Sequence, residues 1–312
     1  MILITCPAKR GNKKMSDIEV WPSLPLEAWD ETRATLHMWT QVVGKIRLAQ
    51  SPHINHWWQV PLYLTARGLT TSPMPYDSRL FEIDFDFISH QLIIKTSDGQ
   101  VSTLKLEPRS VAEFYKLLME SLSGLGLDIS INPMPCELPD PIAFNEDEKH
   151  ASYDAEYANR FWRILLQADR VFKEFRARFI GKVSPVHFFW GSFDLAVTRF
   201  SGRRAPERVD ADLITREAYS HEVISHGFWP GGGEMKGAAF YSYTAPAPEG
   251  LGEQSVKPPA AFYAKEMSEF FLMYDDVRGA SEPDETLMEF LQTTYEAGAN
   301  LANWNRTELE RE

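Results

Sequence analysis

The sequence predicts an α+β fold made of two related halves, in each of which antiparallel strands lie between two helices. Three observations carry this prediction. Helical and strand-like periodicities both occur along the chain, the strand-like segments follow one another without intervening helices, and a pattern repeats at an offset of 133 residues. The first copy runs through Ser51 and Trp57, and the second runs through Ser184 and Trp190. The two sheets could join into one across a pseudo-twofold axis, and chance similarity between aromatic-rich units is the alternative.

The first half is expected at 16–131 and begins with a helix at 26–49. Apolar side chains recur in this segment at steps of three and four, as on the buried stripe of an amphipathic helix. A second helix is expected at 109–125, where glycines mark the end, as they often do. Strands are expected at 59–66, 79–88, 91–96, 100–106 and 127–131.

The second half is expected at 153–306, after a linker at 132–152 that contains four prolines and a run of acids. It begins with the most regular helix of the chain, at 155–180, and ends with a helix that starts near Pro283. Strands are expected at 187–200, 219–229, 238–245 and 269–277. The intervening loops at 201–217, 229–237 and 245–260 are long, and long loops in a compact domain are often functional.

The composition argues against several classes of partner. A formal net charge of -12 disfavours binding to nucleic-acid phosphates, and no apolar run approaches the roughly 18 residues of a membrane helix. The two cysteines, Cys6 and Cys136, have neither disulfide-framework nor zinc-ligand spacing, which indicates a cytoplasmic protein. Residues 1–15 are expected to be a disordered leader. A homodimer is compatible with the sequence, and the residues name no cofactor.

Three arginines near a glycine form the first candidate site. Arg199 precedes Gly202, and Arg203 and Arg204 follow it. Guanidinium groups match carboxylates and phosphates with two parallel hydrogen bonds, so this segment could hold an anionic group of a ligand. The alternative is a solvated loop whose arginines pair with nearby acids such as Glu207.

His187, Glu222 and His226 are the acid–base candidates. Glu222 and His226 share one face in either kind of element. On a helix they would lie within about 6 Å, close enough for one metal ion, but on the expected strand they lie about 13 Å apart, which is too far. No metal site is therefore expected. On one continuous strand His187 and Asp194 would lie about 23 Å apart, so they can cooperate only if Gly191 breaks the strand. The alternative for His187 is a core histidine with satisfied hydrogen bonds.

Tryptophans dominate the pocket that we expect between the halves. Trp57 and Trp58 are adjacent, so on a strand they point to opposite faces, and at least one should contact solvent or a cavity. Simple core packing is the alternative. The other expected ligand-binding residues are Arg67, Trp190, Asp194 and Trp229.

Several long segments carry a family resemblance. The most specific is SPVHFFWGSFDLAVTRFSGRRAP at 184–206, and NHWWQVPLYLTARGLTTSPMPY at 55–76 and GFWPGGG at 227–233 agree with it. Together they resemble an uncharacterised bacterial family known as a domain of unknown function, from about Trp21 to Trp304. The resemblance implies a bacterial, cytoplasmic protein, and it supplies no activity, cofactor or catalytic residue.

Three hypotheses about function follow. The first is an enzyme or binding protein for a small anionic or aromatic molecule, with one pocket between the halves. The second is a non-enzymatic interaction module that presents an aromatic surface to a partner chain. The third, weakest one is a metal-dependent hydrolase that uses Glu222 and His226. Only the first requires the arginines and histidines to converge in a concave pocket.

Overall fold

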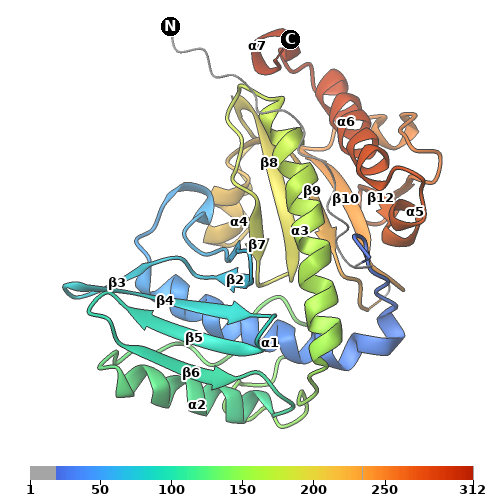
Figure 1. The fold of residues 1–312 in the computed structure, drawn as a ribbon. Coiled ribbons are helices and arrows are strands. Elements are labelled where there is room, and N and C mark those ends of the chain that lie inside the picture. The colour runs from blue at the N-terminus through green and yellow to red at the C-terminus, as the bar shows by residue number, and fades with distance from the viewer. Residues whose placement is uncertain (1–18, 234, 312) are drawn as a thin grey trace, which may run out of the picture.

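Two antiparallel sheets of six strands each organise the computed structural model, which describes residues 19–233 and 235–311 (Figure 1). Helices cover both sheets, so the α+β prediction is confirmed. Each half has the expected order of helix, strands and helix. The pseudo-repeat itself stays a prediction, and the expected leader at 1–15 lies outside the described residues.

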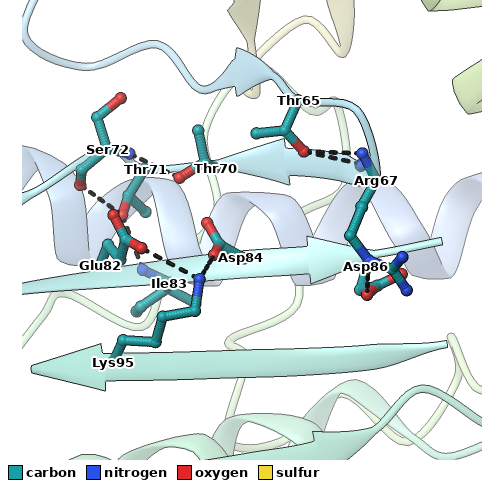
Figure 2. Close-up of polar contacts among 11 residues, drawn as sticks. Thr65, Arg67, Thr70, Thr71, Ser72, Glu82, Ile83, Asp84, Asp86 and Lys95 are labelled. Atoms are coloured by element: carbon teal, nitrogen blue, oxygen red, sulfur yellow. Dashed lines mark hydrogen bonds and ion pairs between the residues drawn. The ribbon is translucent and has the colours of Figure 1, made fainter. Parts of the chain in front are cut away.

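The first sheet has the strand order β1-β2-β4-β5-β6, with β3 beside β4. The helix α1 (Leu26–Gln50) passes behind it, and α2 (Val111–Gly124) packs on α1. Figure 2 shows polar contacts on this sheet, where the Lys95 ammonium donates hydrogen bonds to the carboxylates of Glu82 and Asp84. Its strands are β1 (Tyr63–Leu64), β2 (Gly68–Thr70), β3 (Met74–Tyr76), β4 (Arg79–Asp86), β5 (Gln91–Thr96) and β6 (Val101–Lys105).

The second sheet has the strand order β11-β12-β10-β9-β8-β7. Figure 1 shows α3 (Ala155–Ala177) and α6 (Pro283–Leu301) over one face, and α4 (Leu213–Ala218) on the far side. Its strands are β7 (His187–Phe189), β8 (Asp194–Arg204), β9 (His221–Trp229), β10 (Ala239–Ala245), β11 (Phe262–Ala264) and β12 (Glu269–Met273). The short helices are η1 (Asn55–Trp57), η2 (Leu251–Glu253), α5 (Tyr274–Arg278) and α7 (Arg306–Leu309).

The two halves meet through one backbone bridge and a shared core. The amide of Leu62 donates to the Phe188 carbonyl at 2.9 Å, and the Phe188 amide donates to the Leu62 carbonyl at 3.0 Å. Beneath this bridge Trp29 of α1 packs on Phe161 of α3, with ring centroids 5.2 Å apart. The two sheets therefore remain separate and are joined by this backbone bridge. One apolar core extends through both halves.

Several expected strands differ from the structure for reasons of hydrogen bonding. Only Tyr63 and Leu64 of the segment 59–66 are in a strand, because η1 and a turn occupy the residues before them. The segment 127–131 buries alternate side chains as a strand would, yet the Leu127 amide bonds back to the end of α2 rather than to a ladder. The segment 187–200 is broken by a turn into β7 and β8.

The segment 132–152 contains no helix or strand and packs closely against the first half. The side chain of Phe144 is fully buried, and the Asp147 carbonyl accepts a hydrogen bond from the amide of Ala112 at 3.0 Å. The amide of Cys136 donates to the Gln41 side chain of α1 at 2.9 Å. These contacts fix the following residue, Glu137, against the second half.

Candidate functional site

A cavity of about 490 Å³ lies on the face of the second sheet that α3 and α6 leave uncovered. Side chains alternate along β8, so Asp194, Ala196, Thr198 and Phe200 line the cavity while the intervening residues face the helices. Residues of η1 and α4 form the opposite wall. Aromatic rings supply much of the lining, as in many small-molecule sites.

Asp194 is the polar centre of one end of this cavity. Its side chain accepts a hydrogen bond from the Ser192 hydroxyl at 2.8 Å and another from the hydroxyl of Tyr241. Tyr241 reaches it from β10 across β9, because Gly227 of β9 leaves the space that the ring occupies: a β-carbon there would lie 2.2 Å from the ring. Burial raises the pKa of Asp194 to about 6, although these two donors oppose the shift.

Two further carboxyl groups line the same end. Glu269 begins β12, and burial together with the charge of Asp194 raises its pKa to about 7. Glu137 comes from the segment between the halves and packs over Gly191, and burial raises its pKa as well. All three carboxyl groups therefore have pKa values above their usual range, which is uncommon for exposed acids.

Hydroxyl groups form the middle of the cavity floor. The hydroxyl oxygens of Thr198 and Ser225, on neighbouring strands, lie 2.9 Å apart. The hydroxyl oxygen of Tyr243 lies 3.0 Å from that of Tyr219, at the end of α4. Such groups donate and accept, so they can orient a polar ligand without fixing its charge.

Lys182 lies next to residues that line the other end of the cavity and does not line the cavity itself. The Lys182 ammonium donates to Nε2 of His56 at 2.7 Å and lies 5.3 Å from the centroid of the Trp58 ring and 4.8 Å from that of Phe200. Because Nε2 accepts this bond, His56 is neutral and its Nδ1 donates to the Ala218 carbonyl at 3.3 Å. Burial and the charge of Lys182 lower the pKa of His56 accordingly.

The structure brings together only part of the residue set expected from the sequence. Trp58, Asp194 and Trp229 line the cavity. Trp57 and Arg204 line a separate groove of about 760 Å³ beside α4.

Arg199 and His226 lie on the opposite face of the sheet, under α3 and α6. The Arg199 guanidinium stacks 3.5 Å from the ring centroid of Phe175 and donates to that residue's carbonyl. Nε2 of His226 lies 3.1 Å from the Thr294 hydroxyl, and burial lowers the pKa of this histidine well below its usual value. Both side chains are fixed in the core and do not reach the cavity.

Arg203, Glu222 and Arg67 are engaged in ion pairs away from the cavity. Arg203 contacts the Glu222 carboxylate at 2.7 Å, at the rim near the end of α6. Arg67 contacts the buried carboxylate of Asp86 at 2.6 Å in the first sheet (Figure 2). The three arginines expected to hold one anion therefore do not converge.

His187 and Trp190 contribute to packing behind the cavity wall. His187 is 1% exposed, its ring lies among those of Trp58, Tyr63 and Phe189, and burial lowers its pKa to about 3. Its burial agrees with the core position of the alternative interpretation, and neither of its ring nitrogens has a hydrogen-bond partner among the described residues. The Trp190 indole donates to the carbonyl of Val60 at 2.8 Å.

Sequence reasoning missed most of the carboxyl cluster. Tyr241 and Tyr243 alternate along a predicted strand, which was a usable signal for a shared face. Glu269 and Glu137 gave no such signal, because one begins a strand and the other lies in the presumed linker. Their proximity depends on the order of the strands and on the path of the segment 132–152.

Two negative observations apply to the part of the chain that the structure describes. No group of three or more histidine, cysteine, aspartate or glutamate side chains is arranged there to hold a metal ion. None of its helices combines the length and the apolar character needed to cross a membrane.

Comparison with known proteins assigns the chain to a family without assigning a reaction. A search of curated proteins found no match, and a search of solved structures found none either. One family model does match, over residues 21–311, which is nearly the whole chain. The protein therefore belongs to DUF5996, a family of unknown function.

Proposed function

We propose that this protein is an enzyme that binds a small polar molecule in the cavity of the second sheet and transfers protons to or from it. The observation that carries the proposal is the position of Asp194, which is 6% exposed and lies beside Glu269 and Glu137 in a cavity of about 490 Å³. Cavities of this size with a few convergent polar groups suit small ligands. Carboxyl groups with pKa values near neutrality suit acid–base catalysis.

The two best-placed carboxyl groups differ in the protonation state that their surroundings favour. Asp194 accepts hydrogen bonds from two hydroxyl groups, which favours its ionised form, so it is the candidate base. Glu269 has the higher pKa, about 7, and is the candidate acid. Trp229 and Phe271 provide apolar surface against which the ligand would pack.

The test is a fragment screen by ligand-observed NMR on the wild-type protein and on Asp194→Asn and Glu269→Gln. We expect fragments with amine or hydroxyl groups to bind the wild type and to lose affinity in both variants. The matched control is Glu266→Gln, because Glu266 is exposed and does not line the cavity. Fragments that bind all four proteins equally would contradict the proposal.

Calorimetry would test the proton transfer itself. Since the carboxyl pKa values lie near neutral pH, binding of a hit at pH 6.5 should take up or release protons. The measured heat would then depend on the ionisation enthalpy of the buffer. A heat that is independent of the buffer for every hit would reduce the proposal to simple binding.

One observation favours a second candidate, the interaction module. Val209, Leu213 and Ile214 are 68%, 73% and 49% exposed on and before α4, and exposed apolar patches often mark contact surfaces. In this alternative the patch would join two copies of the chain. Light scattering would find a dimer that dissociates in Leu213→Asp, whereas a monomer in both proteins would contradict it.

A cytoplasmic location is part of our proposal. It rests on the sparse cysteines of the sequence and on the free thiol of Cys136.

A further inference from the structure

We propose that the cavity of the second sheet selects an organic cation, a protonated amine joined to an apolar or aromatic body that carries no acidic group. This inference rests on the proposed function, because it assigns a ligand class to the same cavity. It follows from the charges and the rings that the lining combines.

The charged groups of the lining all have one sign. Asp194, Glu269 and Glu137 line the cavity, and within the described part of the chain its lining contains no lysine and no arginine. His56 also lines it and is neutral, because its Nε2 accepts a hydrogen bond from Lys182. An acidic ligand would meet like charges and no cationic partner there, which makes such a ligand unfavourable.

The Asp194 carboxylate is buried without a positive partner. It is 6% exposed, and the side chains that donate to it are the neutral hydroxyls of Ser192 and Tyr241. Two hydroxyl groups satisfy part of its hydrogen-bonding capacity and none of its charge. A buried carboxylate in this state is costly, and the ammonium group of a ligand would offset that cost.

The surroundings of the three carboxyl groups add further negative charge. Burial is the main reason why their pKa values are raised, and the charged neighbours that add to the shift are themselves acids. These neighbours are Glu137 for Asp194, Asp194 for Glu269 and Asp212 for Glu137. Within residues 19–233 and 235–311, these carboxyl groups are not arranged to hold a metal ion, so an organic ammonium group is the cation that suits them.

Aromatic rings lie around the same carboxyl groups. Phe189 is paired with Asp194 in the ladder of β7 and β8, and Tyr241 is paired with Phe271 in the ladder of β10 and β12. The ring of Tyr243 stacks on that of Tyr241, with centroids 6.1 Å apart. The face of such a ring attracts a cation, and the same rings offer apolar surface to the rest of the ligand. Carboxylates and rings therefore favour the same kind of molecule.

The experiment is a calorimetric titration of the wild-type protein with benzylamine, benzyl alcohol and benzoate, which share one ring and differ in charge. The same three end groups on phenethyl and cyclohexylmethyl bodies make the result independent of one ligand shape. We expect at least one amine to bind about tenfold more tightly than its matched alcohol, which is the effect of one charge-assisted hydrogen bond. The matched carboxylate should not bind at the concentration that saturates the protein with the amine.

Asp194→Asn should remove the advantage of the amine and leave the affinity for the alcohol unchanged. Glu269→Gln should act in the same direction and guards against misfolding of the first variant. The matched control is Asp169→Asn, because Asp169 is 9% exposed on α3 but already pairs with Lys173, at 2.6 Å, and does not line the cavity. This control should keep the full preference for the amine.

The results separate this inference from the proposed function. If no amine binds more tightly than its matched alcohol, the organic cation is wrong, and the proposed function stands as long as the fragment screen finds ligands that depend on Asp194. If the screen finds none either, both proposals fail. A preference for the amine that Asp194→Asn and Glu269→Gln leave intact would also contradict the inference, because the amine would then bind elsewhere.

Discussion

The Tyr241 hydroxyl donates a hydrogen bond to the Asp194 carboxylate across the whole width of the strand that separates them. Removing this donor in Tyr241→Phe should raise the pKa of Asp194 above its present value of about 6, by about one unit, because the ionised form loses a partner. A carbon-13 NMR titration of labelled aspartate side chains would measure the shift. The control is Tyr243→Phe, whose hydroxyl contacts Tyr219 instead. An unchanged titration in Tyr241→Phe would contradict the assignment.

Gly227→Ala should disrupt the same contact through sterics. A β-carbon at this position would lie 2.2 Å from the ring of Tyr241, so the ring must move away from Asp194. We expect the free energy of unfolding to fall by about 1–3 kcal/mol, the usual cost of overpacking. Urea denaturation would measure this.

Gly124→Ala is a suitable control, because nothing lies within 4 Å of the added carbon. The double variant Gly227→Ala, Tyr241→Ala should be more stable than the sum of the single effects, because the clash is gone. Strict additivity would show that the ring does not fill this space.

Asp194 should make the stability of the protein depend on pH. Its folded-state pKa of about 6 lies above the usual 3.8, so the folded protein binds this proton more tightly than the unfolded chain does. The unfavourable contribution of Asp194 therefore grows as the pH rises from about 4 to 6 and is complete above that range. Relative to wild type, Asp194→Asn should gain about 1–3 kcal/mol of stability between pH 4 and pH 8.

Thermal or urea unfolding at each pH would test this difference. Comparison with the variant is essential, because His37, His187 and His226 titrate in the opposite sense. Burial depresses their pKa values, so their contribution to stability is lost as the pH falls. A difference between wild type and Asp194→Asn that is the same at every pH would contradict the raised pKa.

Arg199 and Arg203 should differ sharply in their effect on stability. Arg199 is fully buried between aromatic rings, so Arg199→Ala leaves a cavity and should cost about 2–5 kcal/mol. Arg203 forms a largely exposed ion pair, and Arg203→Ala should cost about 0–1 kcal/mol. Chemical denaturation of both variants would check the contrast, and equal losses would show that the core position of Arg199 is not important.

The helices were predictable because their signals are local. The expected segments 26–49 and 155–180 correspond closely to α1 and α3, whose buried stripes follow from the order of residues within each helix. The expected strand 59–66 is largely wrong, because only Tyr63 and Leu64 join a ladder, and the further bridge of Leu62 to Phe188 joins residues far apart in the chain.

Only those features of the candidate site that depend on alternation within one strand could be predicted from the sequence. Alternation along β8 already separates Asp194 from Arg199, since an odd number of steps places two residues on opposite faces. The same alternation argues against Arg199 as a lining residue of the pocket. The meeting of Asp194 with Glu269 depends on the order β8-β9-β10-β12, which no local pattern contains.

The bridge between Leu62 and Phe188 has a consequence for how the molecule holds together. The cavity takes His56 and Trp58 from one side of this junction, Glu137 from the connecting segment, and its floor from the other side. Neither half can therefore form the binding site alone. A ligand would act as a clamp, and a chain nicked between the halves should separate less readily when its cavity is filled.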